Sequence, residues 1–154
     1  MSDKTKRVIY VGPADGANEK PLNEEGVCTE ACLPGAVVDY AAASAGLELM
    51  DDAATVFGKP LLVADKDQMR SKSVDDLWTA DENMVAIRPR SGEFLNVRVV
   101  TGQALLRGTA LTRSAATPGN LVIAATDGTE EVLCYSDEAV TTAANNELVR
   151  IRVA

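Results

Sequence analysis

The residue types that carry most enzyme chemistry are scarce in this chain. The sequence has no histidine, which is the commonest general acid–base and the commonest metal ligand in proteins. A serine or cysteine nucleophile activated by histidine therefore cannot be assembled from it. A serine–lysine pair remains open, and Ser71-Lys72-Ser73 is the nearest segment, but adjacent residues do not face each other. The sequence names no catalytic site, and we expect a protein that is not an enzyme.

Three cysteines are the next candidates for chemistry. Cys28, Cys32 and Cys134 lack the closely spaced pairs that are usual at zinc sites and would need a carboxylate as fourth ligand. On an extended strand the Cα atoms of Cys28 and Cys32 would lie about 13 Å apart, beyond the roughly 7 Å limit of a disulfide. Only a turn or a helix between them would permit a bridge. We interpret all three as small buried hydrophobic residues in a reducing compartment.

Acidic residues could in principle bind calcium. Asp65, Asp67 and the pair Asp75-Asp76 lie close together in the sequence, but this segment lacks the central glycine and closing glutamate of a calcium loop. We interpret it as a solvated acidic loop. The glycines form neither a dinucleotide-binding motif nor a phosphate loop. We therefore expect no metal and no cofactor.

The charge balance excludes a class of partner. There are 15 basic and 23 acidic residues, a net charge of −8, whereas a nucleic-acid binder needs a basic surface. Residues 88–113 are the exception, with one acidic residue and five arginines. The arginines are Arg88, Arg90, Arg98, Arg107 and Arg113. They are either solvated strand edges or a patch that contacts an acidic protein surface.

The ends and apolar runs of the chain give no targeting signal. The first seven residues are polar, and the apolar run after them is too short for a signal peptide. No stretch approaches the roughly 20 apolar residues of a membrane span. We expect synthesis in the cytoplasm and no association with a membrane.

Short strands are the elements that would position these residues. Val85 and Ile87 share one face of residues 84–88, and apolar residues at 95, 97 and 99 share one face of residues 93–99. With the turn at 89–92 between them, these period-two patterns predict a β-hairpin. Residues 73–78 begin with a capping-box pattern and predict one short helix. Further strands are predicted at 35–40, 46–50, 60–64, 109–112, 120–125, 132–135 and 148–153. Strands at this spacing, with turns between them, predict a mainly β sandwich or barrel.

The first 27 residues differ from the rest. Residues 6–11 are β-prone, but residues 12–26 are rich in Gly, Pro, Asn, Asp and Glu and have almost nothing to bury except Leu22. Such a segment cannot offset its ordering entropy by its own burial. It is either a flexible tail or an extended arm that orders on a partner. We divide the chain into an extended N-terminal arm, residues 1–27, and a single β-rich domain, residues 28–154.

Several small motifs recur in an order that resembles the head decoration (cement) proteins of tailed bacteriophages. The resemblance runs from residue 31 to residue 154. Its motifs are Leu33-Pro34-Gly35-Ala36-Val37-Val38, Gly46-Leu47-Glu48-Leu49, Leu61-Leu62-Val63-Ala64, residues 74–78, Val85-Ala86-Ile87-Arg88, residues 94–99, Gly102-Gln103-Ala104, Gly108-Thr109-Ala110-Leu111, Pro118-Gly119-Asn120-Leu121, Val132-Leu133-Cys134-Tyr135 and residues 149–153. Two features depart from the family: Glu82-Asn83 replace the glycine that often follows Asp81, and the N-terminal extension is not required by the compact module.

The resemblance implies a fold and a role. The fold would be a small β-barrel or β-tulip-like domain with little helix, without enzyme activity or cofactor. The protein would bind the outer surface of the expanded capsid, often as a homotrimer although a dimer is possible, and would clamp neighbouring subunits of the major capsid protein. It would be a virion component on the exterior of the capsid, made in the host cytoplasm.

We expect the capsid contact in the arm. Five arm residues, Arg7, Val8, Ile9, Tyr10 and Val11, would add to the capsid as a strand, and many weak contacts on one shell would raise the avidity. The arginine-rich stretch is a second candidate for a capsid-facing surface. On this interpretation, removal of residues 1–25 abolishes binding and leaves the domain folded. The alternatives are a tail or head-completion component, or a trimeric all-β enzyme.

Overall fold

The computed structural model describes residues 6–13, 21–42, 44–51, 60–126 and 128–154. Within these ranges the chain consists of strands and turns and contains no helix, hence none that could cross a membrane. The mainly β prediction is confirmed. The strands are β1 (Tyr10–Gly12), β2 (Leu22–Val27), β3 (Val37–Tyr40), β4 (Leu47–Leu49), β5 (Leu62–Ala64), β6 (Asn83–Arg88), β7 (Phe94–Val99), β8 (Ala104–Leu105), β9 (Ala110–Arg113), β10 (Leu121–Ile123), β11 (Cys134–Ser136), β12 (Val140–Thr141) and β13 (Glu147–Val153).

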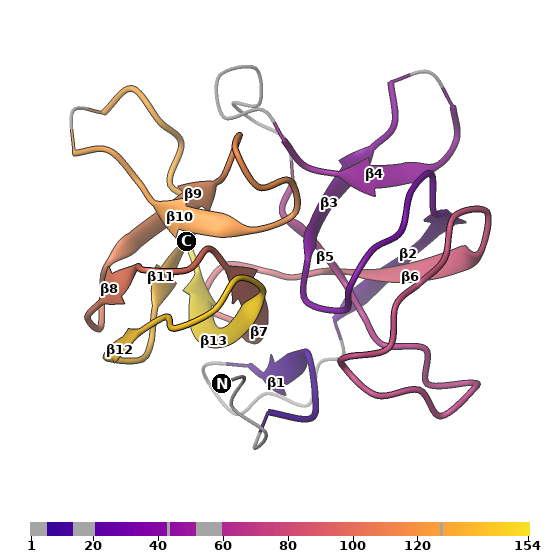
Figure 1. Ribbon diagram of the computed structural model, residues 1–154, viewed down its shortest axis with the longest axis horizontal. Coiled ribbons are helices and arrows are strands. Elements are labelled where there is room, and N and C mark those ends of the chain that lie inside the picture. The colour runs from indigo at the N-terminus through magenta and orange to yellow at the C-terminus, as the bar shows by residue number, and fades with distance from the viewer. Residues whose placement is uncertain (1–5, 14–20, 43, 52–59, 127) are drawn as a thin grey trace.

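Five strands close into a barrel, which occupies the left half of Figure 1. β7, β10, β9, β11 and β13 are hydrogen-bonded in this order, and β13 pairs again with β7 from Glu147↔Val99 to Arg152↔Phe94. Every second side chain of β7 and β13 is buried and apolar: Leu95, Val97, Val99, Val149, Ile151 and Val153. The alternation in the sequence therefore fills the inside of a closed sheet, and closure satisfies backbone groups that would otherwise lie at open edges.

The strands β2, β6, β5, β3 and β4 form a second sheet in this order, at the right of Figure 1. Its outer strands approach each other where Cys28, directly after β2, forms a bridge with Leu47 of β4. The Thr29 N–H donates to the Leu47 carbonyl at 3.0 Å. Gly46 permits this approach, because a Cβ atom there would lie 2.6 Å from the Val27 carbonyl oxygen. We call this unit the curled sheet.

The curled sheet and the barrel share buried surface. The middle strands β3, β5 and β6 bury side chains on both faces, and β5 and residues 84–87 of β6 are therefore continuous apolar runs. Val38, Leu62 and Ala86 point into a small core within the curled sheet. Their neighbours Val37, Val63 and Ile87 belong to the same core cluster as the residues inside the barrel. One apolar cluster therefore connects the two units.

The predicted hairpin of residues 84–99 is wrong. β6 pairs with β2 and β5, whereas β7 pairs with β1, β10 and β13. Residues 89–92 carry the chain from the curled sheet to the barrel. Alternation specifies which face of a strand is buried, but it does not specify which strand is its neighbour.

The predicted short helix is also absent from the described residues. Ser73 and Asp76 do form capping-box hydrogen bonds, since the Ser73 N–H donates to Asp76 Oδ2 at 2.6 Å. The turn does not continue as a helix, because the N–H and the carbonyl of Trp78 form hydrogen bonds with the backbone of Cys32, at 2.8 and 3.0 Å. The Trp78 indole also donates to the Asp65 carbonyl at 2.7 Å. Burial of this large side chain in the curled sheet outweighs a local helical signal of two turns.

The described residues of the predicted arm are part of the fold rather than a separate segment. β1 pairs with β7, and β2 pairs with β6 along its whole length. Ile9 is 1% exposed and lies in the cluster that fills the barrel. Residues 1–5 and 14–20 of the predicted arm lie outside the described ranges.

Gly35 lies at the junction of the two units and gives a test of their packing. Its φ is +87°, and a Cβ atom would lie 2.6 Å from Leu148 Cδ2 and 3.2 Å from the Asn96 carbonyl oxygen. Gly108 is a matched control, with φ +86° and no atom within 4 Å of a Cβ. Gly35→Ala should lower the free energy of unfolding by about 1–3 kcal/mol more than Gly108→Ala, measured by urea denaturation. Equal losses would contradict close packing at this junction.

Candidate interaction surfaces

The five arginines of residues 88–113 do not lie on one surface. Arg88, Arg90 and Arg107 are exposed. Arg98 is 2% exposed and Arg113 1% exposed. The strand register directs these two side chains into the interior, where acidic or carbonyl oxygens receive them. A basic patch of all five residues, as the sequence suggested, is therefore wrong, and only the three exposed arginines are accessible to a partner.

Arg98 connects three segments of the chain. Its Nε donates to the Pro34 carbonyl at 2.8 Å, and its Nη1 donates to the Asn146 carbonyl at 2.6 Å. Its Nη2 donates to the Val74 carbonyl and lies 3.4 Å from the Asp75 carboxylate. Burial lowers the pKa of Arg98, and the Asp75 charge opposes this shift. The guanidinium group thus joins the turn before β3, the turn at 73–76 and the turn before β13.

The N-terminal residues 6–12 are fastened along the barrel. Lys6 Nζ forms an ion pair with Glu138 at 2.5 Å and donates to the Leu148 carbonyl at 2.8 Å. The Asn96 side chain donates to the Val8 carbonyl at 2.7 Å, and its backbone N–H donates to the Ile9 carbonyl at 2.8 Å. The segment is thereby held at both its side chains and its backbone.

Three of the five predicted arm residues are exposed on this fastened segment. Arg7, Val8 and Val11 face solvent, whereas Ile9 is buried and Tyr10 is half-buried. The Tyr10 hydroxyl donates to Glu93 Oε1 at 3.2 Å. Release of the whole segment to pair with a partner would expose Ile9, so the side chains that it offers as folded are Arg7, Val8 and Val11. We call these three residues the N-terminal edge.

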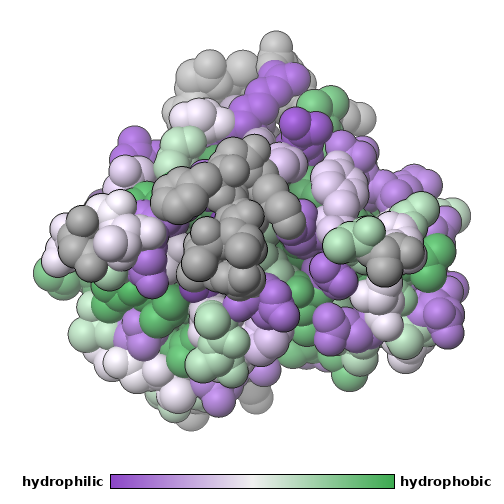
Figure 2. Space-filling model, turned by 90° about the horizontal axis from the view of Figure 1, so that it is seen from above, coloured by the Kyte–Doolittle hydropathy of each residue, from purple (hydrophilic) through white to green (hydrophobic). Residues whose placement is uncertain are grey.

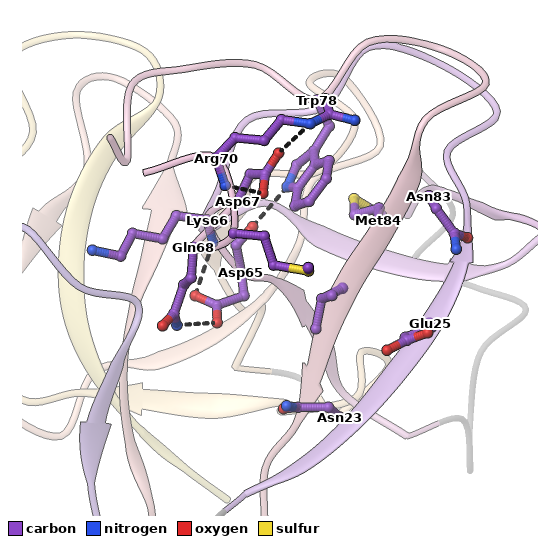
Figure 3. A pocket seen from close by; sticks show the side chains of 12 residues that line it. Asn23, Glu25, Asp65, Lys66, Asp67, Gln68, Arg70, Trp78, Asn83 and Met84 are labelled. Carbon is purple, nitrogen blue, oxygen red and sulfur yellow. Dashed lines mark hydrogen bonds and ion pairs between the residues drawn. The ribbon is translucent and has the colours of Figure 1, made fainter. Parts of the chain in front are cut away.

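A pocket of about 600 Å³ lies where β2 and β6 meet the segment that follows β5 (Figure 3). Figure 3 shows its side chains, which come from both strands and from residues 65–70, with Trp78 at one end. The lining residues are Asn23, Glu25, Asp65, Lys66, Asp67, Gln68, Met69, Arg70, Trp78, Asn83, Met84 and Val85. The lining mixes charges of both signs with two methionines, which does not single out one ligand class.

Of the four aspartates interpreted from the sequence as a solvated acidic loop, Asp75 and Asp76 are exposed, whereas the two that line this pocket are buried. Asp65 and Asp67 are 9% and 7% exposed. Asp65 accepts hydrogen bonds from the Lys66 N–H and the Gln68 side chain, at 2.8 and 3.0 Å. Asp67 accepts from the Arg70 N–H at 3.1 Å and pairs with its guanidinium group. Both carboxylates hold their own turn together, and in the part of the chain that is described no cluster of three metal-ligating residues occurs.

The three cysteines are not brought together at one site. Cys28 and Cys32 lie in the core of the curled sheet, whereas Cys134 lies in the core of the barrel, so the three do not form a zinc site. The Lys72 amine contacts the Leu77 carbonyl at 3.4 Å and the Glu82 carboxylate at 3.8 Å. The prediction that the cysteines are buried is confirmed.

Two exposed apolar side chains were not singled out from the sequence. Met69 is 98% exposed and Leu106 is 68% exposed, each within a polar turn. An apolar residue between turn-forming residues was the only sequence signal available for them. Figure 2 shows that apolar and polar side chains are interspersed on the face seen from above Figure 1. A partner on that face would contact scattered apolar side chains rather than one continuous patch.

The role of Arg98 can be tested by stability. Arg98→Ala should lower the free energy of unfolding by about 3–5 kcal/mol, because three buried carbonyl oxygens lose their donor. Arg98→Lys keeps the charge without the planar set of donors and should recover only part of the loss. The control Arg88→Ala, at an exposed position, should change stability by no more than about 0.5 kcal/mol. A similar small change for both alanine variants would contradict the connecting role of Arg98.

Comparison with known proteins shows the fold. No family model and no curated protein sequence matches this chain. A solved structure, described as the crystal structure of the head fiber gp8.5 N base in bacteriophage phi29, matches with a TM-score of 0.56 and 11% sequence identity. The match covers 88% of this chain and 95% of that chain. This chain therefore shares its barrel-containing, mainly β fold with the base of a phage head fiber.

Proposed function

We propose that this protein is a structural component of a phage virion and acts by binding the head. The observation that carries the proposal is the fold shared with the phi29 head fiber base over 88% of this chain. The order of motifs from residue 31 to residue 154, which resembles head decoration proteins, supports the same class of virion protein independently. Fold alone does not determine function, so the proposal rests on the agreement of these two observations.

In its finer form, the proposal is that the protein decorates the outer surface of the expanded capsid. It would clamp neighbouring subunits of the major capsid protein and act as a homotrimer, without catalysis. The absence of histidine supports a binding role over an enzymatic one, and the net charge of −8 argues against contact with the packaged DNA. The same fold could serve in a tail or head-completion protein. The binding experiment must therefore distinguish this alternative from capsid decoration.

The N-terminal edge is the capsid contact that we propose. Val8 and Val11 are 46% and 44% exposed, and Arg7 lies beside them. The segment is anchored by Ile9 and Lys6, so these side chains are presented without loss of the barrel core. A preorganised strand costs less entropy on binding than a flexible arm would. The exposed arginines Arg88, Arg90 and Arg107 are additional candidates for contact with acidic capsid residues.

The proposal is tested by co-sedimentation with expanded shells of the parent virus that lack this protein. Saturable binding at a fixed ratio per capsid subunit is expected, and the ratio distinguishes trimeric from dimeric sites. Unexpanded shells serve as the control for a site that is created by expansion. The absence of binding to expanded shells would overturn the decoration role and favour a tail or head-completion protein.

Point variants test the N-terminal edge better than a deletion. Removal of residues 1–25 would also remove Ile9 and most of β2, and so would destabilise the fold. The triple variant Arg7→Glu, Val8→Asp, Val11→Asp leaves the buried residues in place and should weaken shell binding by about tenfold or more. Leu106→Asp, at another exposed apolar position, should leave binding unchanged. Wild-type affinity of a triple variant with an unchanged melting temperature would exclude this contact surface.

A further inference from the structure

Cys28 and Cys32 are held at the two ends of a bend in the chain. Residues 29 and 30 form the bend, and both cysteines are fastened to the same neighbouring segment. The Cys28 N–H donates to the Glu82 carbonyl, and its carbonyl accepts from the Asp81 N–H, both at 2.8 Å. The N–H and carbonyl of Cys32 pair with Trp78. The chain is therefore bent rather than extended here, as a bridge between the two cysteines requires.

Both thiols lie in the core of the curled sheet, where Cys28 is 1% exposed and Cys32 is 2% exposed. The Cys28 thiol donates to the Glu30 carbonyl at 2.6 Å, within the bend itself. Hydrogen bonding with Cys32 lowers the pKa of Cys28 to about 7, although burial opposes the shift. The same interaction, together with burial, raises the pKa of Cys32. The opposite shifts of the two pKa values make Cys28 the better nucleophile of the pair.

Cys134 provides an internal contrast. It is fully buried, lies in the barrel core, and its pKa is raised by burial alone. The thiolate is the nucleophile in thiol–disulfide exchange. Near neutral pH, the electrostatics therefore favour reaction at Cys28 and disfavour it at Cys134.

We propose that Cys28 and Cys32 are a redox-active pair that forms an intramolecular disulfide when the chain meets a disulfide oxidant such as oxidised glutathione. The Cys28 thiolate attacks one sulfur of the oxidant, which forms a mixed disulfide and releases one glutathione thiolate. Cys32 then loses its proton to solvent, and its sulfur attacks the Cys28 sulfur and releases the second glutathione. Two protein thiols are oxidised, and one glutathione disulfide is reduced to two thiols.

The cross-link would lock the closure of the curled sheet. Cys28 forms the bridge to Leu47 of β4, and the Leu49 N–H donates to the Glu30 carboxylate at 3.2 Å. A disulfide across this bend restricts the segment that joins β2, β4 and residues 78–82. Thr29, Glu30 and Ala31 are exposed, so the oxidant can reach the pair by local opening of the bend rather than by global unfolding.

The biological role of this disulfide rests on the proposed function, but the formation of the disulfide does not. A virion protein is made in a reducing cytoplasm and later meets an oxidising medium outside the cell. The pair would be reduced during assembly and oxidised after release. The closure of the curled sheet would therefore be strengthened after the protein had been placed on the head.

The experiment uses the purified full-length protein in a series of glutathione redox buffers. After acid quenching, free thiols are labelled with N-ethylmaleimide under denaturing conditions and the protein is digested with trypsin. Because trypsin does not cleave before proline, residues 8–66 form one peptide that contains both Cys28 and Cys32. Cys134 lies in the peptide of residues 114–150. We expect the first peptide to be unlabelled and about two mass units lighter than its unmodified dithiol form, while Cys134 stays labelled.

Stability and variants complete the test. The oxidised protein should melt about 4–8 °C higher than the reduced protein, because the cross-link restricts the unfolded chain. Cys28→Ser and Cys32→Ser should each abolish this rise, whereas Cys134→Ser should keep it. We also compare the ratio of reduced to oxidised glutathione at which half of the pair is oxidised. This ratio should be about tenfold or more higher for the folded protein than for the urea-unfolded chain. Full labelling of residues 8–66 in the most oxidising buffer, or disulfides formed only between molecules, would overturn the proposal.

Discussion

The structure depends on an apolar layer that the barrel and the curled sheet bury together. Val37, Val63 and Ile87 leave the curled sheet and enter the cluster that also contains the inward residues of β7 and β13. Each unit by itself has a small core, since most of its apolar residues are Ala, Val and Leu, and a small core supplies little stability. Their shared layer makes one larger core, and the position of every exposed surface follows from it.

Polar groups at the margin of this layer fix how the two units meet. The Arg98 guanidinium group donates hydrogen bonds to the carbonyl oxygens of three turns, and Asn96 donates hydrogen bonds to the carbonyl oxygens of residues 8 and 9. Buried polar groups of this kind cost desolvation unless they are paired, so they penalise every arrangement in which the partners are misplaced. The N-terminal strand is part of this arrangement, because the donors and the pocket for Ile9 are supplied by the barrel.

The proposed virion role assigns different tasks to different parts of the same chain. The barrel and the curled sheet supply the folded body, and residues 7–11 carry the exposed N-terminal edge. The bend at residues 28–32 is the point where the curled sheet closes by bridges rather than by a full strand pairing.

The sequence alone determined most of the strands, since the positions of β3, β4, β5, β6, β7, β9, β10, β11 and β13 follow from apolar runs, β-branched residues and turn residues. It did not predict β2, β8 or β12, which are short or poor in apolar residues. It also determined the lack of histidine chemistry and the acidic surface. These are local or compositional properties, and each can be read within a few residues. Tertiary structure decided which strands pair, because a strand with one apolar face fits any neighbour of the same pattern; residues 84–88 and 93–99 therefore went to different sheets instead of one hairpin. It also decided that Arg98 and Arg113 are buried, that Ile9 anchors the N-terminal segment, and that Cys28 and Cys32 flank one bend in a shared core. Each of these depends on partners that are distant in the chain or on a bend that the local sequence does not predict.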